Sequence, residues 1–189
     1  MIAIVGNSGS VLKHEHGGLI DKAQLVIRFN DAPVRKFERY VGSGTDIRLI
    51  AYHGADYNLQ NENIYLYSYN IKAQDEAYDK LIEKNSVNFL GKKAITFCDN
   101  LISKPYWRWR FLPGRIIIHK RMSSTGLKAI VWMMAWDEEI NLFGFNEDPQ
   151  FHYYEPNREG YNQDDSHDFK KERKIIKGFE DEGKLKIYS

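Results

Sequence analysis

Two segments of this 189-residue chain decide its fold: Ile4-Val5-Gly6-Asn7-Ser8-Gly9 and Val26-Ile27-Arg28-Phe29-Asn30-Asp31-Ala32-Pro33. In each segment, a short apolar run of strand type leads into an asparagine, and the first asparagine lies in a glycine-flanked turn. Neighbouring strands of an open α/β sheet bring such residues together at their carboxyl ends, where amides and glycine N–H groups can bind one phosphate. The two segments therefore predict a nucleotide-binding unit, although a lone Gly-x-x-Gly turn is more often only structural.

Strand-like apolar runs alternate with helical patterns along the rest of the chain, which favours a largely parallel sheet covered on both faces. We expect strands at Ile2–Val5, Val26–Phe29, Ile47–Tyr52, Asn63–Tyr69, Ala94–Phe97, Ile116–His119, Ile140–Phe145 and Leu185–Tyr188. We expect helices at Gln74–Lys84, Thr125–Trp136 and Phe169–Glu182. Since no repeat or linker interrupts this alternation, the sequence predicts a single α/β domain over residues 1–189 with a Rossmann-like sheet.

The composition excludes several classes of protein. Hydrophobic residues make up 42% and charged residues 28%, which excludes disorder, and a net charge of +1 argues against a bulk polyanion such as nucleic acid. The single Cys98 cannot form an internal disulfide. No apolar run approaches the roughly 20 residues that span a bilayer, and the glycine turn follows Met1 too closely for a leader peptide. We expect a soluble, cytoplasmic protein without a membrane span.

A second informative segment, Ser123-Ser124-Thr125-Gly126-Leu127, opens a predicted helix and is followed by the apolar run Ile140–Phe145. Either serine is a good N-cap, and Gly126 in the first turn leaves backbone N–H groups uncovered. A helix start of this kind attracts anions. Taken alone, the segment is more often a plain helix cap.

Two of the six histidines lie in informative surroundings, in Phe151-His152-Tyr153-Tyr154-Glu155 and in His167-Asp168-Phe169-Lys170-Lys171-Glu172. Helical spacing after His167 places it at a helix start, with Asp165 and Ser166 as candidate caps. The helix dipole there disfavours the imidazolium form, and a neutral imidazole is what a general base needs. We interpret the other four histidines as surface or packing residues.

These segments together resemble glycosyltransferase family 29, the sialyltransferases of the eukaryotic type. The residues from Ile4 to Arg48 are similar to the large sialylmotif of that family, and those from Ser124 to Phe145 to the small motif. The segment from His152 to Glu155 resembles the third motif, and His167 with Glu172 resembles the very small motif. Four motifs in the order of the family are hard to obtain by chance.

The resemblance implies a variant glycosyltransferase A fold and an inverting, metal-independent transfer. Sialic acid, or a related ulosonic acid such as Kdo, would pass from a CMP-sugar donor such as CMP-Neu5Ac to a glycan hydroxyl, with no cofactor. His167 would deprotonate the acceptor hydroxyl, and His152 would hydrogen-bond the leaving phosphate. The implied donor-binding residues are Asn7, Ser8, Gly9, Asn30, Ser124, Thr125, Gly126, Phe143, Gly144 and Phe145, of which the last three would flank the cytidine. The absence of an Asp-x-Asp triplet agrees with metal independence.

The chain also departs from the family. Golgi members join the large and small motifs by a disulfide, whereas the corresponding positions here are Ile2 and Asp137. We expect no counterpart of the membrane anchor and stem of those members, and Ser123 stands where the family often has proline. The acceptor, the linkage and the choice between Neu5Ac and Kdo therefore stay open.

Three other interpretations compete with a transferase. A dinucleotide dehydrogenase lacks the full Gly-x-Gly-x-x-Gly spacing here and leaves the histidine motifs unexplained. A non-catalytic relative that binds CMP or a glycan has little reason to keep both His152 and His167. The segment from Lys104 to Arg110 interleaves bases and aromatics in a way that suits single-stranded nucleic acid, but it also suits a lid over the sugars or a plain surface strand.

Overall fold

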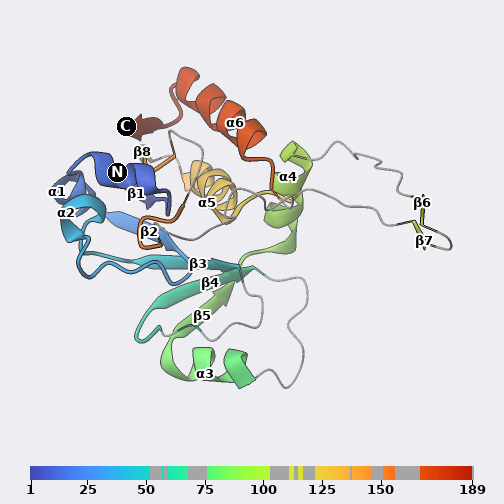
Figure 1. The fold of residues 1–189 in the computed structure, drawn as a ribbon, viewed down its shortest axis with the longest axis horizontal. Helices are drawn as coiled ribbons and strands as arrows, with labels where there is room; N and C mark the ends of the chain where they lie inside the picture. The colour runs from blue at the N-terminus through green and yellow to red at the C-terminus, as the bar shows by residue number, and fades with distance from the viewer. Residues whose placement is uncertain are drawn as a thin grey trace.

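The computed structural model describes residues 1–51, 57, 59–67, 76–102, 111–112, 115–116, 122–136, 138–145, 151–155 and 167–188. Seven strands form one all-parallel sheet in the order β5-β4-β3-β2-β1-β8-β9 (Figure 1). The strands are β1 (Ile2–Val5), β2 (Leu25–Phe29), β3 (Ile47–Ala51), β4 (Asn63–Tyr67), β5 (Ser86–Phe89), β8 (Ile140–Phe143) and β9 (Lys186–Tyr188). The helices are η1 (Gly9–Lys13), α1 (Gly17–Ile20), α2 (Glu38–Val41), α3 (Glu76–Lys84), α4 (Lys92–Ile102), α5 (Thr125–Met133), η2 (Met134–Trp136) and α6 (Phe169–Asp181). The predicted α/β class with a parallel sheet and flanking helices is confirmed.

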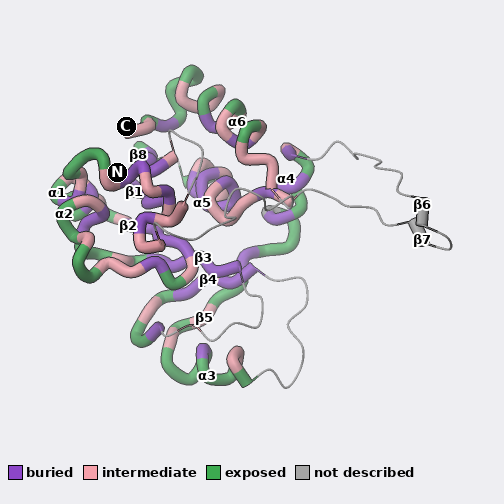
Figure 2. The backbone as a smooth tube through the Cα atoms, in the orientation of Figure 1, coloured by how far each residue is buried: buried purple, intermediate pink, exposed green. Residues whose placement is uncertain are grey.

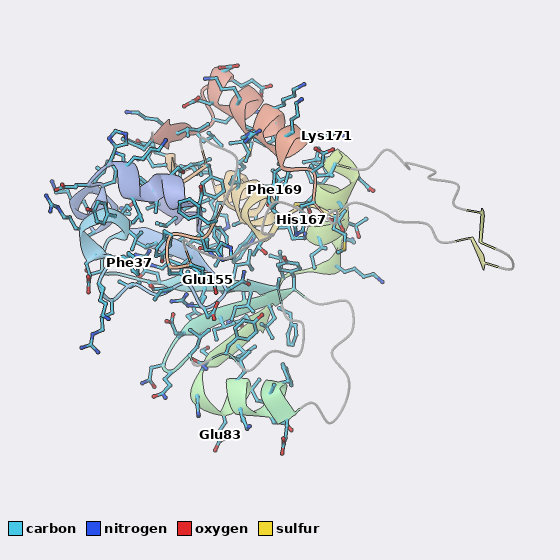
Figure 3. The ribbon with its side chains drawn as sticks, viewed as in Figure 1. Phe37, Glu83, Glu155, His167, Phe169 and Lys171 are labelled. Atoms are coloured by element: carbon cyan, nitrogen blue, oxygen red, sulfur yellow. The ribbon has the colours of Figure 1, made fainter. Side chains whose placement is uncertain are left out.

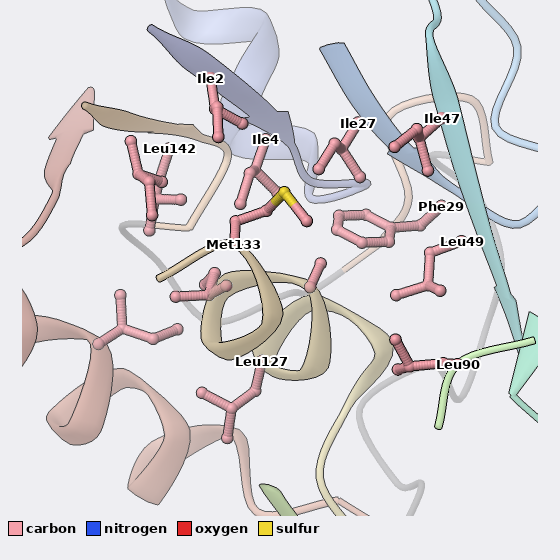
Figure 4. Close-up of a cluster of buried hydrophobic side chains, with 14 of the residues drawn as sticks. Ile2, Ile4, Ile27, Phe29, Ile47, Leu49, Leu90, Leu127, Met133 and Leu142 are labelled. Carbon is pink, nitrogen blue, oxygen red and sulfur yellow. The ribbon is translucent and has the colours of Figure 1, made fainter. Parts of the chain in front are cut away.

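Alternate residues of the central strands face two different hydrophobic clusters. Ile2 and Ile4 of β1 pack with Leu127 and Met133 of α5, as Figure 4 shows, and residues of α4 and α6 extend the same cluster. Ala3 and Val5 point to the opposite face, where η1, α1 and α2 lie. Because both faces are covered, the inner strands β1, β3 and β8 are buried over their whole length (Figure 2). This explains why these strands are mostly apolar in the sequence.

The strand order reverses direction at β1. Successive strands β1 to β5 extend the sheet to one side, whereas β8 and β9 lie on the other side of β1. In open parallel sheets, ligands bind at the carboxyl ends of the strands beside such a switch point. The turn after Val5 and the chain after Phe143 meet at this place.

The prediction of a strand at Ala94–Phe97 is wrong, because this segment belongs to helix α4. Ile95, Cys98, Asp99 and Ile102 are buried, at the spacing of one helical face. Strand β5 was not predicted, because it is an edge strand whose residues are mostly exposed and lack an apolar run.

Most other predicted elements agree with the structure within a few residues. The helix expected from Thr125 to Trp136 is α5 followed by η2. Parts of three predicted elements, at Tyr52, at residues 68–69 and at residues 74–75, lie outside the described residues. Of the predicted strand Ile116–His119, only Ile116 lies within the described residues. It belongs to the two-residue strand β7 (Arg115–Ile116), which pairs antiparallel with β6 (Phe111–Leu112). The segment from Lys104 to Arg110 also lies outside the described residues.

Within the described residues, no helix is long and apolar enough to cross a membrane.

Candidate active site

The turn after β1 brings two backbone segments into contact at the switch point. The Gly6 amide donates to the Phe143 carbonyl over 2.8 Å, and Gly144 adopts a φ of 77°, in the left-handed region. A Cβ on Gly6 would lie 2.9 Å from the Gly144 carbonyl oxygen and 3.1 Å from the Phe145 ring. Gly6 therefore allows the two strand ends to approach each other, and it presents the side chain of Asn7 beyond them.

Asn7 and Asn30 both lie at this edge of the sheet, but their side-chain amides differ in the hydrogen bonds that they make within the protein. The Asn7 Nδ2 makes only two long contacts of 3.5 Å, to the Phe29 carbonyl and the Tyr154 hydroxyl, and its buried Oδ1 has no hydrogen-bond partner in the described part of the chain. Asn30 has a φ of 49° and accepts from the Ala51 amide through Oδ1 at 3.1 Å. Asn7 is thus the amide with more capacity for a ligand, and Asn30 also holds the end of β3.

The segment around His152 pairs with the glycine turn. His152 and Ser8 form an isolated antiparallel bridge, and the amides of Gly9 and Tyr153 donate to the carbonyls of Phe151 and Asn7. The Tyr153 hydroxyl donates to the Pro33 carbonyl over 2.5 Å, which links the same segment to the chain after β2.

His152 itself has two neighbours on its own segment. Its Nδ1 lies 3.4 Å from the Glu155 carboxylate, and its ring stacks on Tyr154 with centroids 5.0 Å apart. These contacts orient the imidazole on a segment whose backbone pairs with Ser8 and Asn7 at the switch point.

Ser8 caps the short helix η1. Its Oγ accepts from the Ser10 amide at 3.3 Å and from the Ser10 hydroxyl at 3.1 Å. A Cβ on Gly9 would lie 2.1 Å from the Phe151 ring, so this glycine lets the His152 segment pack on the turn. Both residues shape the turn through these contacts, and their predicted contact with a donor stays a prediction.

The start of α5 is held by a buried carboxylate from α6. Ser124 is the N-cap, and its Oγ accepts from the Leu127 amide at 3.2 Å. The Glu172 carboxylate accepts from the Ser124 amide at 2.7 Å and from the Ser124 hydroxyl at 2.5 Å. Burial raises the pKa of Glu172, although both hydrogen bonds and the nearby His167 and Lys128 oppose the rise. The hydroxyl proton of Ser124 is therefore already bonded within the protein.

Thr125 and Gly126 follow the cap in the first turn of α5. Within the described residues, no acceptor bonds their backbone amides, and these are two of the N–H groups that a helix start leaves open. The Thr125 hydroxyl lies 2.5 Å from the hydroxyl of Tyr67, at the end of β4. A Cβ on Gly126 would lie 2.8 Å from the Phe145 ring.

Phe145 connects the two halves of the candidate site, because its ring lies against both Gly6 and Gly126. The open amides of α5 and the turn that carries Asn7 therefore lie on either side of one aromatic ring. Phe143, by contrast, is fully buried and stacks on Tyr188 with centroids 4.9 Å apart. Its ring belongs to the core, so the predicted contact of this segment with cytidine concerns Gly144, Phe145 and the backbone.

His167 precedes α6 and lies beside α4 (Figure 3). Its Nδ1 is 2.9 Å from the Met122 carbonyl, just before the serine pair, and its ring contacts Phe169 with centroids 5.5 Å apart. The helix cap is Asp168, whose carboxylate accepts from the Lys171 amide at 3.1 Å, while Asp165 and Ser166 lie outside the described residues. The prediction that His167 stands at a helix start is confirmed.

Sequence reasoning missed a group of buried polar residues beneath the start of α5: Tyr67, Asp99 and Lys128. The Asp99 carboxylate accepts from the Ser123 amide and hydroxyl at 2.9 and 2.6 Å, and it lies 3.6 Å from the Lys128 ammonium. The ammonium also donates to the Ser123 carbonyl and lies 4.6 Å from the centre of the Tyr67 ring. The one signal in the sequence was a lysine inside the otherwise apolar run that follows Gly126.

Within the described residues, no group of three His, Cys, Asp or Glu side chains could hold a metal ion. The candidate site instead offers hydrogen-bond donors and a helix start.

Fold and site together define an α/β protein in which the His152 segment pairs with the glycine turn at the topological switch point, and His167 precedes α6 beside the start of α5. Residues 2–184 match glycosyltransferase family 29 (sialyltransferase), and the chain belongs to this family. Sialyltransferase-like protein 5 of Oryza sativa subsp. japonica is 30% identical over 166 residues, covering 85% of this chain and 30% of the rice protein. Beta-1,6-galactosyltransferase GALT29A of Arabidopsis thaliana is 24% identical over 207 residues, covering 94% of this chain and 50% of that protein.

A solved structure has the same fold. The crystal structure of a mammalian sialyltransferase in complex with Gal-beta-1-3GalNAc-ortho-nitrophenol matches with a TM-score of 0.66 and 21% identity, over 99% of this chain and 68% of that one. The chain spans about a third to a half of the length of the curated relatives it matches.

Proposed function

We propose that this chain transfers sialic acid, or a related ulosonic acid such as Kdo, from a CMP-sugar to a glycan hydroxyl. The observation that carries the proposal is the convergence of all four sialylmotifs on one edge of the sheet. The His152 segment pairs with the turn at Ser8, and Glu172 of the last motif bonds Ser124 of the small motif. Segments far apart in the sequence thus meet where an open parallel sheet binds its ligand.

The donor nucleotide would bind between the Asn7 turn and the start of α5. A phosphate there would accept hydrogen bonds from the open amides of Thr125 and Gly126 and from Nδ2 of Asn7. His152, next to Ser8, would donate to the same phosphate as it leaves. His167 on the other side of the α5 start would take the proton from the acceptor hydroxyl, which attacks the anomeric carbon with inversion.

Transfer activity is expected to survive chelation with EDTA. A monophosphate leaving group carries less charge than a diphosphate, and hydrogen-bond donors together with a helix start can stabilise it. CMP release measured with and without EDTA checks this expectation. Loss of turnover that magnesium or manganese restores would contradict it.

The choice of donor is tested by incubating the chain with CMP-Neu5Ac, CMP-Kdo and UDP-galactose in turn, with and without a panel of glycan acceptors. UDP-galactose is included because one relative is named a galactosyltransferase. We expect nucleotide release from a CMP-sugar that depends on an acceptor. Tight CMP binding without release from any donor would favour the alternative, a non-catalytic CMP- or glycan-binding relative.

Asn7→Ala and Asn30→Ala are each expected to weaken CMP binding by about 1–3 kcal/mol, the range for a hydrogen bond to a charged group. Asn30→Ala should also lower the melting temperature, because its Oδ1 holds the Ala51 amide. Calorimetry with CMP measures the first effect and thermal unfolding the second. Asn88→Ala, an exposed asparagine on the edge strand β5, is the matched control and should change neither. Unchanged CMP affinity in both site variants would show that the nucleotide does not bind at Asn7 and Asn30.

A further inference from the structure

The peptide group between Ser123 and Ser124 lies between two buried charges. Its carbonyl accepts from the Lys128 ammonium, and its N–H donates to the Glu172 carboxylate at 2.7 Å. The two charged side chains come from different helices, α5 and α6, and both are at most 3% exposed. This peptide leads directly into the first turn of α5, so its orientation sets the direction in which the next two amides point.

Lys128 is unusual because only 1% of it is exposed, and a buried ammonium is costly unless it is paired and hydrogen-bonded. Asp99 supplies the opposite charge at 3.6 Å, and the Tyr67 ring lies 4.6 Å from the ammonium. Asp99 also accepts from the Ser123 amide and hydroxyl. Asp99 and Lys128 therefore both bond Ser123, immediately before the helix cap.

The same group reaches the first turn of α5 through Tyr67. Its ring faces the ammonium, and its hydroxyl lies 2.5 Å from the Thr125 hydroxyl. The side chain of Thr125 and the peptide before Ser124 are therefore fixed by one connected set of buried polar groups. None of these groups has a part in the chemistry proposed above.

We infer that Lys128 is a positioning residue for the donor: its ammonium fixes the peptide between Ser123 and Ser124, and so aims the amides of Thr125 and Gly126 at the donor phosphate. The inference rests on the proposed function, because it concerns how the nucleotide site is held. It predicts that loss of the ammonium weakens binding of the donor and leaves binding of the acceptor unchanged.

The test compares two nearly isosteric side chains at position 128 in a background that removes the counter-charge. Lys128→Gln with Asp99→Asn keeps a donor for the Ser123 carbonyl, whereas Lys128→Met with Asp99→Asn does not. Asparagine at position 99 can still accept from the Ser123 amide. Neither double variant leaves an unpaired buried charge, so we expect both to fold.

The methionine double variant should raise the Kd for CMP and the donor KM on the order of tenfold, as expected for a lost hydrogen bond that orients a charged ligand. The glutamine double variant should stay within about threefold of the wild type, and the acceptor KM should be unchanged in both. Met133→Ala, a core change at the other end of the same helix, is the control: it should lower the melting temperature but not the CMP affinity.

Equal CMP affinity in the two folded double variants would overturn the inference. The inference would also be overturned if the double variants raised the donor KM and the acceptor KM together, in proportion to a loss of stability like that of Met133→Ala. Failure of both double variants to fold would also count against the inference, because the ion pair of Lys128 and Asp99 would then be needed for folding. If the wild-type chain itself does not bind CMP, the proposed function fails instead, whatever the variants do.

Discussion

His167→Ala is expected to lower kcat for sugar transfer by roughly 10²–10⁴-fold, the usual contribution of a general base, while the affinity for CMP stays nearly unchanged. The imidazole lies at the start of α6 with its Nδ1 2.9 Å from the Met122 carbonyl, which leaves Nε2 as the nitrogen that can face an acceptor. Since the proposed base acts on the acceptor hydroxyl, its loss should not affect the nucleotide. CMP release and calorimetry measure the two effects separately.

His152→Ala should behave differently from His167→Ala. Its segment pairs with Ser8 and donates to the Asn7 carbonyl, so its proposed partner is the leaving phosphate, and both turnover and CMP affinity should fall. His14→Ala provides the control, because His14 is exposed and outside the site. Near-normal turnover in His167→Ala would show that these roles are wrong. The same conclusion would follow if that variant lost CMP affinity as fully as His152→Ala does.

The inner strands of the sheet were predictable because both of their faces are buried. Ile2–Val5 is a continuous apolar run for this reason, and Ile140–Phe143 is apolar except for the buried Asn141. The edge strand β5 carries no such pattern, since it pairs with only one neighbour and its residues are largely exposed. The search for apolar runs also wrongly predicted a strand at Ala94–Phe97. The buried face of α4 continues from Ile95 to residues one and two helical turns later, which a four-residue run does not reveal.

The site was predictable where its function depends on local chemistry. Glycine turns, a serine cap and a histidine at a helix start each leave a short pattern in the sequence, and their order gave the family resemblance. The contacts among them were not predictable, because they join residues far apart in the chain. Nothing near Lys128 indicates that Asp99 will neutralise it, and the bond between Glu172 and Ser124 spans 48 positions.

Glu172→Ala should lower the free energy of unfolding by about 2–6 kcal/mol. It leaves the Ser124 amide and hydroxyl without their acceptor in a buried place, at about 1–3 kcal/mol for each unsatisfied group. Turnover should fall as well, since Glu172 joins the start of α5 to the helix that carries His167. Urea unfolding measures the first effect and CMP release the second. A variant as stable as the wild type would show that the two hydrogen bonds contribute little.

The dependence of stability on pH tests the state of the Glu172 carboxylate. Burial raises its pKa above the ordinary 4.5, so over a range of pH the folded chain holds a proton that the unfolded chain has released. The stability that comes from this group is therefore fully present below about pH 4.5 and is lost as the pH rises through the raised value. The stability of the wild type relative to Glu172→Gln, which cannot titrate there, should fall as the pH rises. A wild-type advantage that grows with pH would mean that the hydrogen bonds from Ser124 outweigh burial.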